Sequence, residues 1–216
     1  MSLTLYYHPL SSFCHKALIA LYENATPFDG HVVDLMDEKS AVAFKAVWPI
    51  GKFPVLRDEA RDALVPESSI IIEYLDRHYP GATRFLPDDP DLARQTRFRD
   101  RFYDLHINVP MQRIVTDRLR PADARDGFGV AQARAQLQTA LGIVDRAMAN
   151  GGWAMGDAFT MADCAAAPAL FYADTVEPLS PRHGHAARYL ERLRARPSFA
   201  RMLREAEPYF KLFPKE

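Results

Sequence analysis

The chain has 216 residues, with 27 Lys and Arg against 28 Asp and Glu, and a formal net charge of -1 at pH 7. This balance provides no overall basic field, which argues against nucleic acid as a partner. The N-terminal MSLTLYYHPL lacks the pattern of a secretion signal, and no stretch reaches the roughly 18 apolar residues that span a bilayer. Cys14 and Cys164 have no zinc-type spacing. We therefore expect a cytoplasmic protein with no metal and no membrane partner.

Strands and helices alternate in the N-terminal part of the chain. Four short apolar runs have the length of strands: LTLYYH (3–8), HVVDL (31–35), FPVLRD (53–58) and ALVPE (63–67). The polar DEARD between the last two is short enough for a hairpin. Helices are predicted for CHKALIALYEN (14–24) and SSIIIEYLDRHYP (68–80). The order strand, helix, strand, unassigned segment, strand, strand, helix predicts an α/β domain.

The C-terminal part predicts only helices. Phe98, Phe102, Leu105 and Val109 recur at steps of four, three and four, which is the apolar stripe of one long helix. A second stripe of this kind consists of Val130, Ala133, Leu137, Leu141, Val144 and Met148.

A further helix is predicted to begin at Thr160, because TMAD has the form of a capping box between Thr160 and Asp163. YLERLRARP (189–197) and PSFARMLREA (197–206) predict two more helices. Cys164 is expected to pack in a helix core. We therefore expect an α/β domain over residues 1–81, a proline- and acid-rich linker over 82–90, and an all-α helical bundle domain over 91–216.

The tetrapeptide Ser11-Ser12-Phe13-Cys14 lies where the first strand passes into the first helix. A helix N-terminus stabilises an anion, and thioredoxin-type folds place a reactive thiolate there, normally within CxxC. Here Ser11 occupies the position of the attacking cysteine. Its hydroxyl can donate a hydrogen bond to the thiolate of a small thiol substrate, or it can simply cap the helix.

The chain resembles the cytosolic glutathione S-transferase family over nearly its whole length, and five segments in chain order carry the resemblance. They are SSFCHKALIAL (11–21), WPIGKFPVL (48–56), PESSIIIEYL (66–75), FTMADCAAAP (159–168) and RPSFARML (196–203). The first resembles the serine-type active-site segment of bacterial-like members. His15-Lys16-Ala17 stands where relatives often have arginine-valine, and Trp48 replaces a common asparagine, so the branch of the family stays open.

The resemblance implies a thioredoxin-like N-terminal domain, an all-helical C-terminal domain and a homodimer. It implies that the protein is a detoxifying transferase that joins glutathione, its co-substrate, to a small hydrophobic electrophile. Ser11 would stabilise the glutathione thiolate, with Ser12 or Cys14 as alternates. Asp100 or Asp104 would lie near the glutathione of the partner subunit.

The same resemblance assigns the glutathione contacts. Phe53-Pro54 would form a cis bond that exposes the Val55 backbone to a peptide-like ligand. Glu67 and Ser68, at a helix start, suit the ammonium and carboxylate of a γ-glutamyl group, although they can also serve only as caps. Candidates for the glycyl carboxylate are Lys39 and Lys52.

The second-substrate pocket of this fold implies another set of residues: His8, His106, Met111, Phe171 and Tyr172. Tyr6 and Tyr7 are expected to pack or to line the pocket. One alternative to conjugation is disulfide exchange or peroxide reduction by Cys14, although Cys14 in the fourth position suits packing better. Another is a non-catalytic scaffold of the same fold. The electrophile and the reaction subtype stay open.

Overall fold

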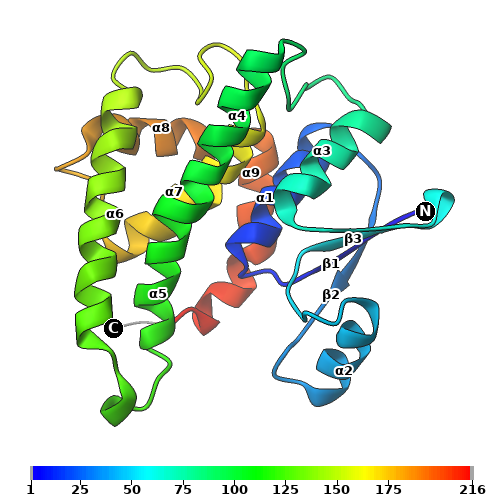
Figure 1. Cartoon of the computed structure of the whole chain (residues 1–216), viewed down its shortest axis with the longest axis horizontal. Coiled ribbons are helices and arrows are strands. Elements are labelled where there is room, and N and C mark those ends of the chain that lie inside the picture. Colours follow the sequence, from blue (N-terminus) through cyan, green and yellow to red (C-terminus); the bar gives the residue numbers. More distant parts are fainter. Residues whose placement is uncertain (1, 215–216) are drawn as a thin grey trace.

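The computed structural model describes residues 2–214, which form an α/β N-terminal domain beside a helical C-terminal domain (Figure 1). The strands are β1 (Leu3–Tyr7), β2 (Asp29–Val32), β3 (Val55–Asp58) and β4 (Ala63–Pro66). They form one mixed sheet in the order β2-β1-β3-β4, with β2 parallel to β1 and β3 antiparallel to both of its neighbours. The predicted fold class is confirmed.

Strand β2 differs from the sequence prediction, because it begins two residues earlier and ends at Val32. Asp29 and Gly30 pair with Thr4 and Leu5 of β1, so that polar residues take up the first part of this edge strand. All four residues of β2 are exposed, so the strand needs no apolar side chains. The apolar run HVVDL, which was used to locate the strand, overlaps it only at His31 and Val32.

Helices cover both faces of the sheet. α1 (Ser12–Glu23) and α3 (Ser68–His78) lie on one face and α2 (Glu38–Val47) on the other (Figure 1). The alternation of side chains along β1 explains this arrangement: Leu5 joins the main core, whereas the Tyr6 ring lies 6.0 Å from that of Phe44 in α2. α2 occupies the segment that the sequence left unassigned. Phe44 is its one buried residue, so a helical period is hard to recognise.

The C-terminal domain contains only helices among the described residues. They are α4 (Pro90–Phe102), a π-helical segment (Tyr103–Asn108), α5 (Val109–Asp117), α6 (Gly127–Ala147), α7 (Met161–Val176), α8 (Gly184–Arg194) and α9 (Pro197–Ala206). Short 3₁₀ turns occur at Glu59–Arg61, Ala122–Ala124 and Glu207–Leu212. α7 is almost entirely buried between its neighbours, and it contains Cys164 as predicted.

The capping box at the start of α7 is confirmed. The Asp163 carboxylate accepts hydrogen bonds from the Thr160 backbone N–H at 2.9 Å and from its hydroxyl at 3.1 Å. It also accepts from the Ala154 N–H at 2.7 Å and the Tyr189 hydroxyl at 2.5 Å. This buried carboxylate therefore joins α7 to α8 and to the loop before α7.

The first apolar stripe of the C-terminal domain lies on the molecular surface. The stripe correctly predicts a continuous helical rod, formed by α4, the π-helical segment and α5, but Phe98, Leu105 and Val109 are exposed. The buried positions of the rod include Tyr103 and Ile107 instead. The core-facing positions already begin in α4 with Ala93, Thr96 and Asp100, so the apolar stripe lies on the opposite face of the rod.

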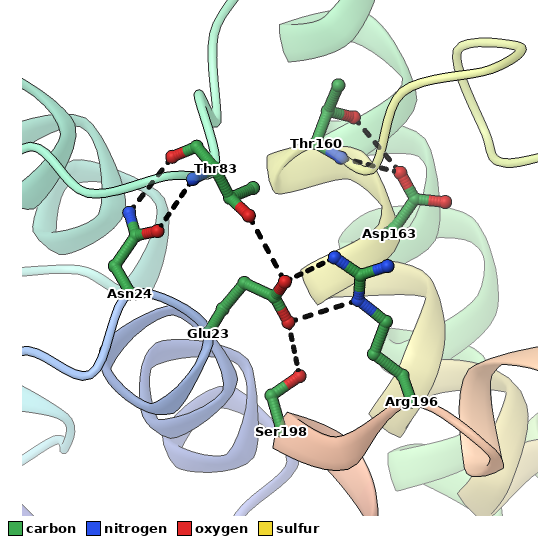
Figure 2. A network of polar contacts seen from close by, with 7 residues as sticks. All are labelled: Glu23, Asn24, Thr83, Thr160, Asp163, Arg196 and Ser198. Carbon is green, nitrogen blue, oxygen red and sulfur yellow. Dashed lines mark hydrogen bonds and ion pairs between the residues drawn. The ribbon is translucent and has the colours of Figure 1, made fainter.

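The two domains are joined through α1, which packs against α3, α7 and α9. The Glu23 carboxylate, at the end of α1, accepts hydrogen bonds from the Thr83 hydroxyl at 3.1 Å, the Ser198 hydroxyl at 2.6 Å and Arg196 Nε at 3.1 Å (Figure 2). Asn24 exchanges two hydrogen bonds of 2.9 Å with the Thr83 backbone. We refer to Glu23, Asn24, Thr83, Arg196 and Ser198 as the Glu23 network.

Candidate functional site

Ser11 is the N-cap of α1, at the end of the loop that follows β1. Its Oγ accepts a hydrogen bond from the Cys14 backbone N–H at 3.3 Å, as a helix cap does. The cap uses an oxygen lone pair and leaves the hydroxyl proton free to donate. The two roles considered for Ser11, capping and thiol binding, are therefore compatible.

The two alternates differ from Ser11 in their surroundings. Ser12 is buried, and its hydroxyl has no hydrogen-bond partner among the described residues. Cys14 is fully buried, and its Sγ accepts the His8 backbone N–H at 3.4 Å. Burial raises the pKa of the Cys14 thiol to about 12, against the smaller opposing effect of hydrogen bonds from Ser11 and His8. This thiol is therefore protonated at neutral pH and shielded from reagents.

A largely apolar cavity of about 690 Å³ opens at Ser11, and we call it the electrophile cavity. Its lining combines residues that the sequence analysis proposed from distant segments: His8, Ser11, Ser12, Lys52, Phe53, Met111 and Tyr172. The His8 ring stacks on Phe53 with centroids 5.8 Å apart. The cavity has the size and character of a site for a small hydrophobic molecule.

The C-terminal segment forms part of the same cavity, which the sequence analysis missed. Phe213 stacks on Tyr172 at 5.3 Å, and Arg118 donates to the Pro214 carbonyl at 3.0 Å. Leu10, Leu35, Gln112, Val115, Thr116 and Leu119 also line this cavity. Contacts between segments so far apart leave no local signal in the sequence.

A second cavity, of about 550 Å³, lies at the start of α3, and we call it the α3 cavity. Glu67 is the N-cap residue of α3 but makes no side-chain cap hydrogen bond, and its φ is 72°. Positive φ is uncommon in residues other than glycine and often marks a functional turn. Glu67 and the buried Ser68 both line this cavity. The first N–H groups of α3 therefore have no cap from Glu67, and such groups bind carboxylates.

The remaining predicted glutathione contacts lie around the electrophile cavity or away from it. The Phe53–Pro54 bond is cis, as the sequence analysis expected. Val55 is buried at the start of β3, where it pairs in register with Tyr6 and Pro66. Lys39 is exposed in the first turn of α2 and is not part of the cavity lining.

His106 does not join the other residues predicted for the second-substrate pocket. It lines a separate apolar groove of about 650 Å³ with Phe98, Phe102 and Leu105 of the helical rod and Ile143 of α6. Met111 and His106 therefore lie on different faces of the rod and line different cavities.

Three further aromatic residues pack away from the electrophile cavity. Phe171 contacts Phe199 and Phe210 rather than lining this cavity. Tyr6 packs under α2, and Tyr7 lines a small cavity with Tyr209, so neither tyrosine lies beside Ser11 as a lining residue.

Lys16 is almost completely buried beside the α3 cavity. Its Nζ lies 2.6 Å from Asp100 Oδ1 and 2.7 Å from Asp104 Oδ2, and it donates to the Ser69 hydroxyl at 2.8 Å. The Ser69 hydroxyl in turn donates to Asp100 Oδ2 at 2.7 Å. We refer to Lys16, Ser69, Asp100 and Asp104 as the Lys16 cluster. Burial and the nearby charge of Asp100 raise the pKa of Asp104, against the opposing charge of Lys16.

Residues 2–214 contain no group of three or more His, Cys, Asp or Glu side chains arranged to hold a metal ion. Within the same range, no helix is both long enough and apolar enough to cross a membrane.

Two domain families match the chain. The N-terminal domain of glutathione S-transferases matches residues 5–83, and their C-terminal domain matches residues 122–192. Together these matches cover more than half of the chain.

Curated relatives carry two kinds of name. The glutathione S-transferase-like protein LUC7 of a Fusarium species is 30% identical over 68% of this chain, which spans 64% of that protein's length. Glutathione S-transferase GstB of Escherichia coli K12 is 26% identical over 74% of this chain and 77% of its own. A stringent starvation protein A homolog of Histophilus somni is 24% identical over 95% of this chain and 92% of its own.

Solved structures agree with these matches. A glutathione S-transferase of Methylobacterium radiotolerans in complex with glutathione sulfonate is 29% identical, with a TM-score of 0.81 and 93% of each chain covered. A glutathione S-transferase of Methylobacillus flagellatus with glutathione bound has a TM-score of 0.85 at 23% identity, covering 93% of this chain and 98% of its own. At 23% identity, the similarity to the Methylobacillus flagellatus structure shows a shared fold alone.

Proposed function

The chain belongs to the glutathione S-transferase family, and on that premise we propose that it binds glutathione and transfers the glutathione sulfur to a small hydrophobic electrophile. The observation that carries the proposal is the position of Ser11, which caps α1 and also lines the electrophile cavity. We further propose that the protein is a cytoplasmic, detoxifying enzyme.

Ser11 would lower the pKa of the bound thiol. A free thiol with a pKa of about 8.5 is only a few per cent ionised at pH 7, and a decrease of about two units requires about 2.7 kcal/mol. One charge-assisted hydrogen bond provides roughly 1.5–3 kcal/mol, and a helix N-terminus adds roughly 0.3–1 kcal/mol. The Ser11 hydroxyl and the start of α1 are therefore sufficient in magnitude.

The thiolate would then attack the second substrate in the electrophile cavity. The sulfur donates an electron pair to an electrophilic carbon, the sulfur–carbon bond forms, and the leaving group departs with its own electron pair. The thiol proton is released when glutathione ionises. Because the cavity holds both reactants together, proximity provides much of the remaining acceleration.

The two ends of glutathione would bind on opposite sides of the sulfur. The first N–H groups of α3, with Ser68, suit the γ-glutamyl carboxylate, and the Glu67 carboxylate suits the ammonium. Lys52, which lines the electrophile cavity, suits the glycyl carboxylate, and the exposed Lys39 is a second candidate. Phe53-Pro54 would contact the cysteinyl part, whereas the Val55 backbone is paired between β1 and β4, which does not support the expected contact with it.

We also propose a homodimer. The exposed stripe of Phe98, Leu105 and Val109 supports it, because large apolar side chains gathered on a surface mark an interaction site. Asp100 and Asp104 are buried and paired with Lys16 within the same chain, which does not support the expected contact with a partner's glutathione.

Two alternatives remain distinguishable. A redox role for Cys14 is disfavoured by the full burial and raised pKa of its thiol. A protein that binds glutathione without transferring it is the second candidate, and the nearly full-length similarity to a stringent starvation protein A homolog supports considering it.

The test follows the ultraviolet absorbance of bound glutathione thiolate across pH in the wild type and in Ser11→Ala, Ser12→Ala and Cys14→Ser. We expect the bound thiol to ionise well below its free pKa, and only Ser11→Ala to shift this pKa upward, with about a tenfold or larger loss of kcat/KM. If Ser12→Ala alone raises the pKa, Ser12 is the thiol partner. Loss of activity in Cys14→Ser would favour the redox alternative, and ionisation without turnover of any electrophile would favour the binding protein.

A further inference from the structure

The proposed function assigns tasks to Ser11 and to the first N–H groups of α3, but it assigns none to the Lys16 cluster. An ammonium group and two carboxylates are all nearly fully buried, at 1% exposure for Lys16, 1% for Asp100 and 5% for Asp104. A buried ion pair contributes little to stability compared with an apolar replacement, because desolvation offsets the attraction. The position of Asp100 and Asp104 in the lining of the α3 cavity points instead to a role in the specificity of that site.

The cluster determines the geometry of that site through Ser69. The Ser69 hydroxyl accepts from Lys16 at 2.8 Å and donates to Asp100 at 2.7 Å, so both of its hydrogen-bonding functions are used. Ser69 directly follows Ser68 in the first turn of α3. Lys16 thereby holds the start of α3, with its N–H groups, against α4.

The cluster also gives the wall of the α3 cavity an excess of negative charge. One ammonium faces the two carboxylates of Asp100 and Asp104, and both of these residues line the cavity together with Glu67. Arg97 lies at the same cavity but forms a two-hydrogen-bond pair with Glu73 at 2.8 Å. Arg101 also lines the cavity and is exposed to solvent. The inner wall therefore favours a cationic group beside the carboxylate-binding N-terminus of α3.

We propose that Lys16 is a positioning residue that holds Ser69, Asp100 and Asp104 so that the α3 cavity selects the ammonium group of a zwitterionic ligand end. In this chain that ligand end is the γ-glutamyl group, so the inference rests on the proposed binding of glutathione. Lys16 itself does not touch the ligand. It acts through the positions of Ser69, Asp100 and Asp104, which it holds by hydrogen bonds and ion pairs.

Calorimetric titration with two ligands tests this role: glutathione and its desamino analogue, which lacks only the α-ammonium group. The readout is the ratio of their dissociation constants. We expect the wild type to prefer glutathione by about tenfold or more, and both Ser69→Ala and the charge-retaining Lys16→Arg to reduce that preference at least about threefold, because each displaces the hydrogen-bonded wall without changing its charge. Glu23→Gln is the matched control, because it alters a polar residue of α1 that lines neither cavity, and it should leave the ratio unchanged.

Each outcome decides the inference. A purely structural role for Lys16 would weaken both ligands equally and leave the ratio unchanged, which overturns the proposal. If Lys16→Arg does not unfold cooperatively, Ser69→Ala decides by itself, because it removes one hydroxyl and no charge. If the wild type binds glutathione without preferring it to the analogue, the inference fails and the proposed function stands. If the wild type binds neither ligand, both fail.

Discussion

Two polar groups on α1, the buried Lys16 and the partly buried Glu23, link the same helix to the C-terminal domain in different ways. They lie seven residues apart, about two helical turns. Glu23 receives one guanidinium, from Arg196, and the hydroxyls of Thr83 and Ser198, so its charge is balanced by one cation (Figure 2). Lys16 instead faces two carboxylates beside a cavity.

The difference distinguishes a polar network that only joins the two domains from one that also borders a binding cavity. The Glu23 network satisfies its own charges and joins α1, the linker and the start of α9, so it holds the domains together without a ligand. The Lys16 cluster leaves negative charge unbalanced where a ligand can enter. Charge balance and access, rather than burial alone, distinguish the two.

The largest effect on stability is expected from Lys16→Met. This change leaves the buried Asp100 and Asp104 without their ammonium, and we expect a loss of about 3–5 kcal/mol in the free energy of unfolding. Urea denaturation at pH 7 measures it, with Lys16→Arg as the charge-retaining control that should lose less. A loss below about 1 kcal/mol would contradict this prediction, because it would show that Asp100 and Asp104 remain buried at little cost without the Lys16 ammonium.

Glu23→Gln should cost less, about 1.5–3 kcal/mol, because it weakens charge-assisted hydrogen bonds but leaves Arg196 stacked over Phe159 with its guanidinium carbon 4.4 Å from the ring centre. Glutathione affinity should not change. Glu191→Gln is the control, since Glu191 pairs with Arg194 on the surface and should contribute within about 0.5 kcal/mol. An equal loss in both variants would contradict a special role for Glu23.

Acidification should affect the two regions in opposite directions. Burial raises the pKa of Glu23, but hydrogen bonds from Arg196 and Ser198 and the charge of Arg196 outweigh it, so the net pKa is lowered. Its stabilising effect is therefore complete above the ordinary glutamate pKa and is lost as pH falls through the folded-state pKa. The raised pKa of Asp104 has the opposite sign, because protonation relieves an unfavourable buried charge as pH falls.

The measurement is the free energy of unfolding from pH 7 to pH 3. The difference between the wild type and Glu23→Gln should shrink as pH falls, whereas the wild type should gain stability relative to Asp104→Asn. Parallel curves for the wild type and Asp104→Asn would contradict the raised pKa.

The smallest effect is expected from Thr83→Ala, which removes one neutral donor at 3.1 Å from Glu23 and keeps the backbone pairing with Asn24. We expect a loss of about 0.5–1.5 kcal/mol by urea denaturation and unchanged glutathione binding. A change in binding would extend the functional region to the Glu23 network and remove the distinction drawn between the two regions.

Much of the fold was predictable because it depends on local patterns. The strands β1, β3 and β4, the helices α3 and α6, and the capping box of Thr160 and Asp163 all correspond to short-range periodicity or cap signals. The helix α2 was missed since Phe44 is its one buried residue. Apolar spacing located the α4–α5 rod but not its buried face, because Phe98, Leu105 and Val109 lie opposite the core-facing positions.

By itself, the sequence determined the fold class, the order of elements and the position of Ser11 at a strand-to-helix corner. These properties follow from residue spacing and cap chemistry within one or two elements. Only the tertiary structure decided that Cys14 is buried, that His106 lies away from Met111, that Phe213 packs on Tyr172, and that Lys16 meets Asp100 and Asp104. Each of these facts depends on how distant elements pack, and packing fixes the solvation and charge environment on which reactivity depends.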